Sequence, residues 1–413
     1  MHASPLKYAA AGLLLFLAAA MAPAQSTPDR PKDAHWVAAW AAAMDSPGPA
    51  LRAQTLRQIV RPSIAGGSVR IRLSNLFGAA PLTVGAVRVA RRADGSAIQP
   101  ASDRAVTFSG KPIVTIAKGD AVLSDPVALP VAAFEELAVS LYLPNGAATS
   151  TIHSVGNQTV YIVPAHDMTA AATFPAGETD DSRYFLSDVE VAAGAGARVI
   201  VALGDSITDG VGSTEERNAR WPDALAARLQ ADPKLAAIAV VNAGVAGNRI
   251  LNDADKPYRG PSSLNRFDRD ALDKPGVRWI ILLQGGNDIS AGEVLTSSKA
   301  KVSAEQIIGG MKVLIERAHA KGVRVIGATL LPKGGTTFPK APSPAAEAKR
   351  QAVNAWIRGG GGFDAVVDFE RVMRDPAQPD RLLPAYDSGD HLHPNDDGYR
   401  AMAAAIDLNL LTQ

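Results

Sequence analysis

The chain has 413 residues, of which 47% are hydrophobic and 20% are charged, and it contains no cysteine. This composition is typical of a soluble globular protein, and the length exceeds what one hydrophobic core usually supports. With 42 basic and 41 acidic side chains, the formal net charge is +1, so we expect no nucleic-acid partner. The lack of cysteine excludes a thiol nucleophile and thiolate metal ligands.

The first 24 residues predict a signal peptide. Lys7 supplies a basic start, residues 9–20 are apolar, and Ala22-Pro23-Ala24 offers small residues for cleavage before Gln25. The apolar stretch is shorter than the ~20 residues that a membrane-spanning helix needs. We therefore expect residues 1–24 to be removed, no membrane span to remain, and the mature chain to be secreted or periplasmic in a bacterium.

Residues 25–195 predict an antiparallel β-sandwich domain, jelly-roll-like in its layout. Apolar and polar residues alternate in short runs, which lie at 69–73, 82–84, 87–89, 138–143 and 160–163. This period of two is typical of strands with one buried face, and Gly, Pro, Asn and Asp between the runs indicate turns. The Gly-Ala run at 192–197 marks the end of the pattern.

Residues 196–413 predict a second domain of the α/β class. Here the apolar runs are continuous, at 199–203, 238–241, 279–283, 323–328 and 365–368, as in parallel strands that are buried on both faces. Between and after them lie helical patterns at 221–231, 304–320 and 396–410. We predict a three-layer α/β/α sandwich around a mostly parallel sheet, with the active site at the carboxyl ends of the strands.

A serine follows the first of these strands, in the segment Gly204-Asp205-Ser206-Ile207-Thr208-Asp209-Gly210. A serine on a strand-to-helix turn can present its hydroxyl at the edge of the sheet and its own amide to an oxyanion. Serine and aspartate are also common helix caps. The segment alone therefore leaves Ser206 open to both interpretations.

Two further segments follow strands and offer hydrogen-bond donors. Gly244, in Asn242-Ala243-Gly244-Val245-Ala246-Gly247-Asn248, could add a backbone amide, although a glycine after a strand can also be a simple turn. Asn287, in Gln284-Gly285-Gly286-Asn287-Asp288, could add a side-chain amide to a developing oxyanion, or it could form an Asx-turn.

The fourth segment, Asp387-Ser388-Gly389-Asp390-His391-Leu392-His393-Pro394-Asn395, supplies a base and a carboxylate. A serine nucleophile needs a base within hydrogen-bond reach, usually one that is held by a carboxylate. Asp390 and His393 are three residues apart, close enough for Asp390 to accept from one imidazole nitrogen. The residues themselves leave open whether His391 or His393 is the base.

Taken together in this order, the four segments resemble the blocks of the SGNH, or GDSL-type, hydrolases. Gly204-Asp205-Ser206-Ile207 is similar to the first block, with Ile207 where many members have leucine; Gly244, Gly285-Gly286-Asn287-Asp288 and Asp390-His391-Leu392-His393 are similar to later blocks. The resemblance implies that Ser206 is the nucleophile, His393 the base and Asp390 its partner. It also implies an oxyanion hole made by the Ser206 amide, the Gly244 amide and the Asn287 side chain.

We therefore predict an exported serine ester hydrolase that cleaves short-chain acyl esters, with acetyl esters on carbohydrate as the preferred substrate class. The expected partner is a small-molecule ester or an acylated glycan, with no cofactor and no metal. Trp221, Tyr258 and Tyr386 could stack on a sugar, although single aromatic residues are more often packing residues.

Two alternatives belong to other classes. A metal-dependent hydrolase could use Asp390, His391 and His393 with Asp205 or Asp209, because Asp and His side chains bind divalent metals. A carbohydrate-binding surface protein could use the β-sandwich, with the hydrolase activity subsidiary. The first leaves Gly244 and Asn287 without a role, and the second leaves the four catalytic segments without one.

Overall fold

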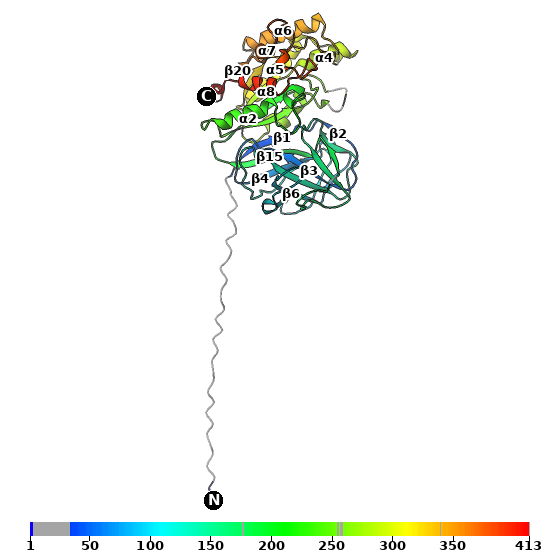
Figure 1. Cartoon of the computed structure of the whole chain (residues 1–413), viewed down its shortest axis with the longest axis vertical. Coiled ribbons are helices and arrows are strands. Elements are labelled where there is room, and N and C mark those ends of the chain that lie inside the picture. The colour runs from blue at the N-terminus through cyan, green and yellow to red at the C-terminus, as the bar shows by residue number, and fades with distance from the viewer. Residues whose placement is uncertain (3–33, 176, 254–255, 257–258, 339, 413) are drawn as a thin grey trace. The chain divides into compact units, whose positions relative to one another are not determined.

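The computed structural model describes residues 1–2 and 34–412, apart from residues 176, 254, 255, 257, 258 and 339. The predicted signal peptide therefore lies, from residue 3 onward, outside the described residues. Every assigned helix and strand falls in the unit formed by residues 35–413, and Figure 1 shows these elements in order of colour along the chain.

Residues 35–193, here called the β region, contain antiparallel strands. These are β1 (His35–Ala41), β2 (Ser46–Gly48), β3 (Gln54–Val60), β4 (Val69–Ser74), β5 (Leu82–Val84), β6 (Ala86–Arg91), β7 (Arg104–Ala105), β8 (Val114–Ile116), β9 (Ala121–Leu123), β10 (Leu137–Leu143), β11 (Ser150–His153), β12 (Val160–Pro164), β13 (Glu178–Asp180), β14 (Arg183–Tyr184) and β15 (Leu186–Ala193), with a short helix η1 (Pro100–Ser102). The sheet orders are β1-β15-β4-β9, β13-β12-β3-β10-β6-β7, β14-β11-β2 and β5-β8.

The alternation in the sequence corresponds to buried and outward faces of these strands. In β4, Val69, Ile71 and Leu73 are fully buried, whereas Arg70 and Arg72 point the other way and pair with Glu190 of β15. Most of the buried apolar residues of the four-stranded and six-stranded sheets belong to one hydrophobic cluster, and Ile59, Ala90 and Ala138 of the six-stranded sheet form a second, small one with Ile98. The prediction of an antiparallel β-rich N-terminal part is confirmed.

Residues 198–411, here called the α/β region, contain the parallel strands β16 (Arg198–Gly204), β17 (Ile238–Gly244), β18 (Val277–Leu283), β19 (Arg324–Ala328) and β20 (Ala365–Val367). Its helices are α1 (Ser206–Asp209), α2 (Trp221–Ala231), α3 (Ser263–Phe267), η3 (Asp268–Leu272), α4 (Gly286–Val294), η4 (Ser298–Ala300), α5 (Ala304–Ala320), α6 (Pro344–Arg358), α7 (Phe369–Met373), η5 (Pro384–Tyr386), α8 (Asp396–Ala404) and η6 (Leu408–Leu411). The sheet has the order β17-β16-β18-β19-β20.

The helices pack in two groups, with α2, α7 and α8 in contact with one another and α3, α4, α5 and α6 forming the other group. The predicted α/β class with a parallel sheet is confirmed. None of the helices in the described part of the chain combines the length and the apolar character that crossing a bilayer requires.

Local sequence signals explain where the longest helix lies. The Ser303 hydroxyl accepts from the Gln306 amide at 3.2 Å, and the Gln306 side chain accepts from the Ser303 amide at 2.8 Å, so α5 begins with a capping box. The predicted helix over 396–410 is shorter than expected, because α8 ends at Ala404. The Asp407 side chain then accepts from the Asn409 amide at 3.0 Å and caps a separate turn.

The strand order places three strand ends at one point. β16 lies between β17 and β18, and Gly204 at its carboxyl end pairs with Gly244 of β17 and Leu283 of β18. The loops that follow these strands therefore start level with one another. A reversal of strand order of this kind is the usual position of a ligand site in an open α/β sheet.

The β region and the α/β region are joined by backbone and ionic contacts. The Val240 amide donates to the Ser63 hydroxyl at 3.0 Å, and the Ala38 amide donates to the Pro275 carbonyl at 2.9 Å. Lys274 and Asp188 form a buried ion pair across the same boundary. Removing the β region would therefore break these contacts and expose to water the apolar side chains of β16 and β17 that pack against β1.

We expect a fragment of residues 196–413 to be less stable than a chain of residues 34–413. Loss of the boundary contacts should lower the melting temperature of the fragment by about 10 °C or more, since the apolar side chains of β16 and β17 that β1 covers become exposed to water at a cost of roughly 25 cal/mol per Å². Thermal unfolding followed by circular dichroism checks this, with the 34–413 chain as control. Equal melting temperatures would contradict a stabilising role for the boundary.

Candidate active site

Ser206 is the first residue of α1 and follows β16 after a single residue. The Asp205 side chain accepts from the amide of residue 207 at 3.1 Å, which caps the helix, and Gly210, with φ of 108°, ends it. This short turn leaves the Ser206 side chain half-buried at the edge of the sheet. Among the residues that the structure describes, no acceptor is found for the Ser206 amide.

Two glycines allow α1 to lie close against the strand ends. A Cβ atom on Gly204 would lie 2.1 Å from the Thr208 hydroxyl oxygen, and one on Gly244 would lie 2.2 Å from the Asp209 amide nitrogen. The Gly244 amide donates to the Asn242 side chain at 2.8 Å. Gly244 is therefore needed for close packing, and its amide, expected from the sequence to face an oxyanion, is already engaged within the protein.

His393 and Asp390 lie next to Ser206. The distance from His393 Nε2 to Ser206 Oγ is 2.9 Å, and the distance from His393 Nδ1 to Asp390 Oδ2 is 2.5 Å. His393 is only 6% exposed. The structure thus brings together the three side chains that the sequence singles out, although Ser206 and His393 are 187 residues apart in the chain.

Asp390 is held as a carboxylate by its surroundings. Its other oxygen, Oδ1, accepts from the amides of Leu392 at 2.9 Å and His393 at 2.8 Å. Burial alone would raise the pKa of Asp390, but the bonds from the His393 ring and from these amides hold it well below its usual range. An ionised Asp390 fixes the ring so that Nε2 faces the serine.

Asn287 lies beside the serine turn, near the start of α4. Its side-chain nitrogen donates to Asp205 Oδ2 at 3.2 Å and to the Asn248 carbonyl at 3.1 Å. Gly285, with φ of 122°, makes the sharp bend between β18 and the helix. Asn287 therefore connects the loop after β18 with the serine turn and with the loop after β17.

The loop after β17 contains a second glycine that the sequence analysis did not single out. The Ala246 amide donates to Asp209 Oδ2 at 2.9 Å, and the Asn248 carbonyl accepts from Asn287, so Gly247 lies between these two anchored residues. Its φ is 73°, which favours glycine. Within the described ranges its amide has no acceptor. The only signal in the sequence was a second glycine three residues after Gly244.

A lysine also supports this group. Lys333 Nζ donates to the Gly286 carbonyl and to the Ser290 hydroxyl, both at 3.2 Å. Burial raises the pKa of Asp205 and lowers that of Lys333, and the attraction between the two charges opposes both shifts. The Lys333 ammonium group thus contacts the first turn of α4 and helps to balance the charge of Asp205, which accepts from Asn287.

His391 is paired with a different carboxylate from the one that contacts His393. Its Nδ1 lies 2.5 Å from Asp387 Oδ2, and the residue is exposed with φ of 59°. Asp390 instead contacts His393, so the donor set of the metal-dependent alternative is divided between two separate pairs. Across residues 34–412, outside the gaps given above, no group of three or more such side chains is arranged to hold a metal ion.

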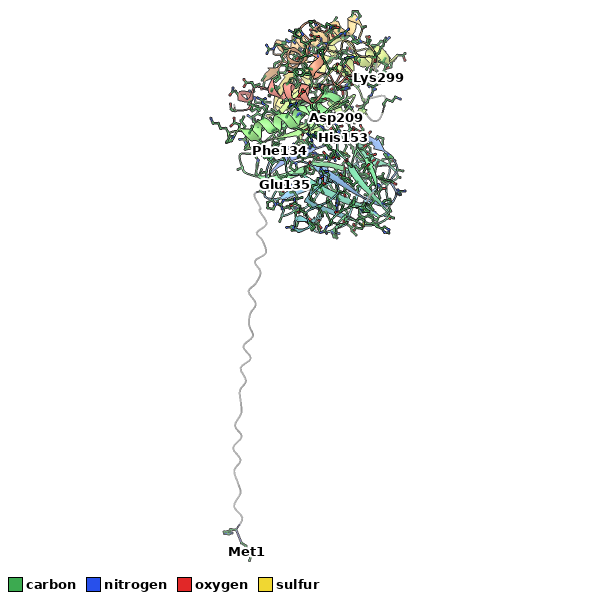
Figure 2. All side chains as sticks on the ribbon, viewed as in Figure 1. Met1, Phe134, Glu135, His153, Asp209 and Lys299 are labelled. Atoms are coloured by element: carbon green, nitrogen blue, oxygen red, sulfur yellow. The ribbon has the colours of Figure 1, made fainter. Side chains whose placement is uncertain are left out.

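The β region reaches the serine turn through the segment 153–157. His153 Nε2 lies 3.0 Å from Asp209 Oδ1, and its Nδ1 lies 2.9 Å from the Ala43 carbonyl. Figure 2 labels His153 and Asp209, which lie next to each other. The Asn157 side chain adds a bond to the Gly210 carbonyl at 3.0 Å. No motif in the sequence indicated these contacts, because His153 stands in a four-residue strand far from the other segments.

Burial alone would lower the pKa of His153, but the carboxylates of Asp209 and Asp45 and the Ala43 carbonyl raise it to about 9. Asp45 Oδ2 lies 3.5 Å from His153 Nδ1. A protonated imidazole therefore lies between two buried carboxylates, directly behind the turn that carries Ser206.

The aromatic residues considered for sugar stacking have different surroundings. Trp221 is fully buried and packs on Phe369 at 5.7 Å between ring centres, so it belongs to the core. Tyr386 is half-buried in η5. Tyr258 lies outside the described residues.

A parallel α/β sheet thus carries a serine, a histidine and an aspartate in one hydrogen-bonded row at its carboxyl edge, an arrangement that also occurs in serine hydrolases of the α/β class. Residues 202–401 match the model of the GDSL-like Lipase/Acylhydrolase family. This part of the chain is a GDSL-type acylhydrolase domain, a carboxylic ester hydrolase by class.

Solved structures of similar fold cover about half of the chain. A putative lipolytic protein of the G-D-S-L family from Desulfitobacterium hafniense is 24% identical, with 50% of this chain and 96% of that chain covered and a TM-score of 0.37. Est24, a carbohydrate acetylesterase from Sinorhizobium meliloti, is 16% identical, with 52% and 99% covered and a TM-score of 0.40. An aryl esterase from M. smegmatis is 15% identical, with 52% and 99% covered and a TM-score of 0.41. No curated protein matches the chain.

The raised pKa of His153 predicts a pH-dependent stability. An unfolded histidine titrates near 6.5, so the stabilisation is fully present below about pH 6.5 and is lost as the pH rises through the folded pKa of about 9. We expect the free energy of unfolding to fall by up to about 3 kcal/mol over this window. Urea unfolding at a series of pH values measures it.

The fall in the free energy of unfolding with rising pH should be absent in His153→Gln. It should be as large as in wild type in the control His166→Gln, since His166 is exposed. If wild type and His153→Gln lose stability in parallel between these pH values, the ionised His153 is not the cause.

Proposed function

We propose that this protein is an exported serine esterase that removes short acyl groups, in particular acetyl groups, from carbohydrate. The observation that carries the catalytic part is the row Ser206 Oγ, His393 Nε2, His393 Nδ1 and Asp390 Oδ2, with contacts of 2.9 and 2.5 Å. This order of groups is what a serine nucleophile with a histidine base requires.

In the first half of the reaction, His393 Nε2 takes the Ser206 proton as Ser206 Oγ bonds to the ester carbonyl carbon. The carbonyl electron pair moves to oxygen and forms an oxyanion. When the tetrahedral intermediate collapses, the bond to the alcohol breaks, and the alcohol leaves with the proton from His393. Water then repeats these steps on the acyl-serine and releases the acid. Asp390 stays ionised and stabilises the imidazolium.

We assign the oxyanion contacts to the Ser206 amide, the Asn287 side chain and the Gly247 amide. Gly247 replaces Gly244, because the Gly244 amide donates to Asn242 at 2.8 Å whereas the Gly247 amide has no acceptor within the described ranges. Asn287 gives up one of its two longer contacts, to Asp205 at 3.2 Å or to the Asn248 carbonyl at 3.1 Å, when it donates to the oxyanion. A preorganised donor of this kind contributes roughly 3 kcal/mol to lowering the barrier.

The preference for short acyl groups is supported by the polarity around the serine. Asp205, Asn287 and Lys333 surround the turn, and the exposed pair His391 and Asp387 lies on the same segment as His393. Such groups suit a hydroxyl-rich alcohol better than a long alkyl chain. Export is part of the proposal and rests on the sequence pattern of residues 1–24.

We expect Ser206→Ala to lose about 10³-fold or more of kcat/KM on p-nitrophenyl acetate, because no other group replaces the nucleophile. Its melting temperature should stay within about 2 °C of wild type, since a half-buried hydroxyl is removed. Steady-state kinetics and thermal unfolding measure both quantities.

Ser298→Ala serves as the control, because Ser298 is exposed on η4. Retained activity in Ser206→Ala, or an equal loss in the control, would rule out Ser206 as the nucleophile.

We expect kcat/KM on p-nitrophenyl esters to be highest for acetate or propionate and to fall by about tenfold or more at octanoate. A polar site offers no apolar surface that could bury the added CH₂ groups, and a long acyl chain would displace water from its polar groups. Acetate release from acetylated xylan, pectin and chitin-type oligosaccharides tests the alcohol part. A maximum at long chains would contradict the short-acyl proposal, and no acetate release from any glycan would contradict the carbohydrate proposal.

A further inference from the structure

A cavity lies between the β region and the α/β region. It is lined by residues of β1, β3, β17 and α2 and by three arginines, Arg61, Arg183 and Arg220, and we call it the arginine cavity. Phe134, labelled in Figure 2, also belongs to its lining. The cavity measures about 40 Å³. Since about 10–15 Å³ admits one water molecule, there is room for roughly three water-sized groups.

Arg183 is the least compensated charge in this cavity. The residue is 4% exposed, and its Nη1 has no hydrogen-bond partner among the described residues. No carboxylate in those residues lies within ion-pair distance of it. Glu216 and Asp181 attract it from farther away, and the face of Trp40 lies 5.6 Å from the guanidinium carbon. Burial and the neighbouring Arg220 lower the pKa of Arg183 to about 9. A buried guanidinium without an acceptor is strongly unfavourable.

Gln158 presents a second donor without a partner. It is 5% exposed, lines the arginine cavity, and its Nε2 has no acceptor within the described ranges. Both unpaired buried groups in this cavity are thus donors. Buried polar groups in folded proteins are nearly always hydrogen-bonded, so two unpaired donors facing one space indicate a missing acceptor.

The remaining charges of the cavity do not supply that acceptor. Arg220 donates to the Gly156 carbonyl at 2.6 Å, and Arg61 stacks on Phe134 at 4.3 Å. Glu136 is paired with Arg92 at 2.9 Å.

Asp223 is the one other carboxylate among the lining residues. It accepts from the Arg220 amide at 3.3 Å, and although burial raises its pKa, Arg220 and Arg61 lower it. Asp223 thus balances one of the three arginines, and the attraction of Glu216 and Asp181 for Arg183 still leaves its Nη1 without an acceptor in the described residues.

We propose that the arginine cavity binds a small inorganic oxyanion, phosphate or sulfate, which accepts hydrogen bonds from Arg183 and Gln158 and neutralises Arg183 and Arg220. Guanidinium groups are the preferred partners of such anions. The donors come from β14, from the segment after β11 and from the start of α2, so a bound anion ties the β region to the α/β region. This inference is independent of the proposed esterase function.

A second, smaller cavity shares Trp40, Arg183 and Arg220 with the first and extends to His153 and Asp209. The anion site therefore adjoins the buried pair behind the serine turn. Its occupancy stabilises the same boundary that His153 joins.

The experiment compares thermal unfolding of the full chain in phosphate, in sulfate and in chloride at matched ionic strength. Wild type should melt about 5 °C higher in saturating phosphate or sulfate than in chloride. Arg183→Met keeps the apolar stem and removes the charge, so it should show no such rise. In chloride alone it should melt at the same temperature as wild type or higher, because it lacks the unpaired buried charge.

Arg104→Gln is the matched control, since Arg104 is exposed on β7 and outside the cavity, and it should respond as wild type does. Gln158→Met is the second variant, and titration calorimetry with phosphate should show one site per chain in wild type with about tenfold weaker affinity in this variant. A wild-type melting temperature indifferent to the anion, or an equal rise in Arg183→Met, would overturn the proposal and leave water as the occupant.

Discussion

The carboxylate of Asp209 holds three parts of the chain in one geometry. One oxygen contacts the His153 ring of the β region at 3.0 Å, and the other accepts from the Ala246 amide in the loop after β17 at 2.9 Å. The residue itself ends the turn that begins with Ser206. Because a buried carboxylate that loses its partner is costly, none of these parts can shift without the others. The position of Ser206 thus depends on His153, which lies outside the parallel sheet that Ser206 follows.

The boundary between the two regions is built from buried polar and ionic groups as much as from apolar contacts. Besides the pair of His153 and Asp209, it contains the ion pair of Lys274 and Asp188. Buried ion pairs add little net stability compared with apolar packing, but separating the two charges within the fold is costly because each is left buried without a partner. Such a boundary allows only one arrangement of the two regions. The distance between the turn that carries Ser206 and the neighbouring loops is thereby fixed.

The parts of the site that could be predicted from the sequence are those with local causes. Continuous apolar runs indicate parallel strands, and parallel strands end at one edge, so Ser206 and Asn287 could be expected together. Asp390 and His393 are only three residues apart, so their contact could be expected from the sequence. The place of Gly244 depends on how closely α1 approaches β17, and the contact of His153 depends on packing between regions. Neither the position of Gly244 nor the contact of His153 leaves a pattern along the sequence, because both result from tertiary packing alone.

The contacts of segment 153–157 also bear on how such a protein can change over evolution. His153 contacts Asp209, the Gly156 carbonyl accepts from Arg220, and the Asn157 side chain donates to Gly210; these partners lie in or near the turn that carries Ser206. A β region borrowed from another protein would have to supply the same imidazole, carbonyl and carboxamide at the same places. Exchange of one region alone would therefore break these contacts unless the residues on both sides of the boundary were exchanged with it.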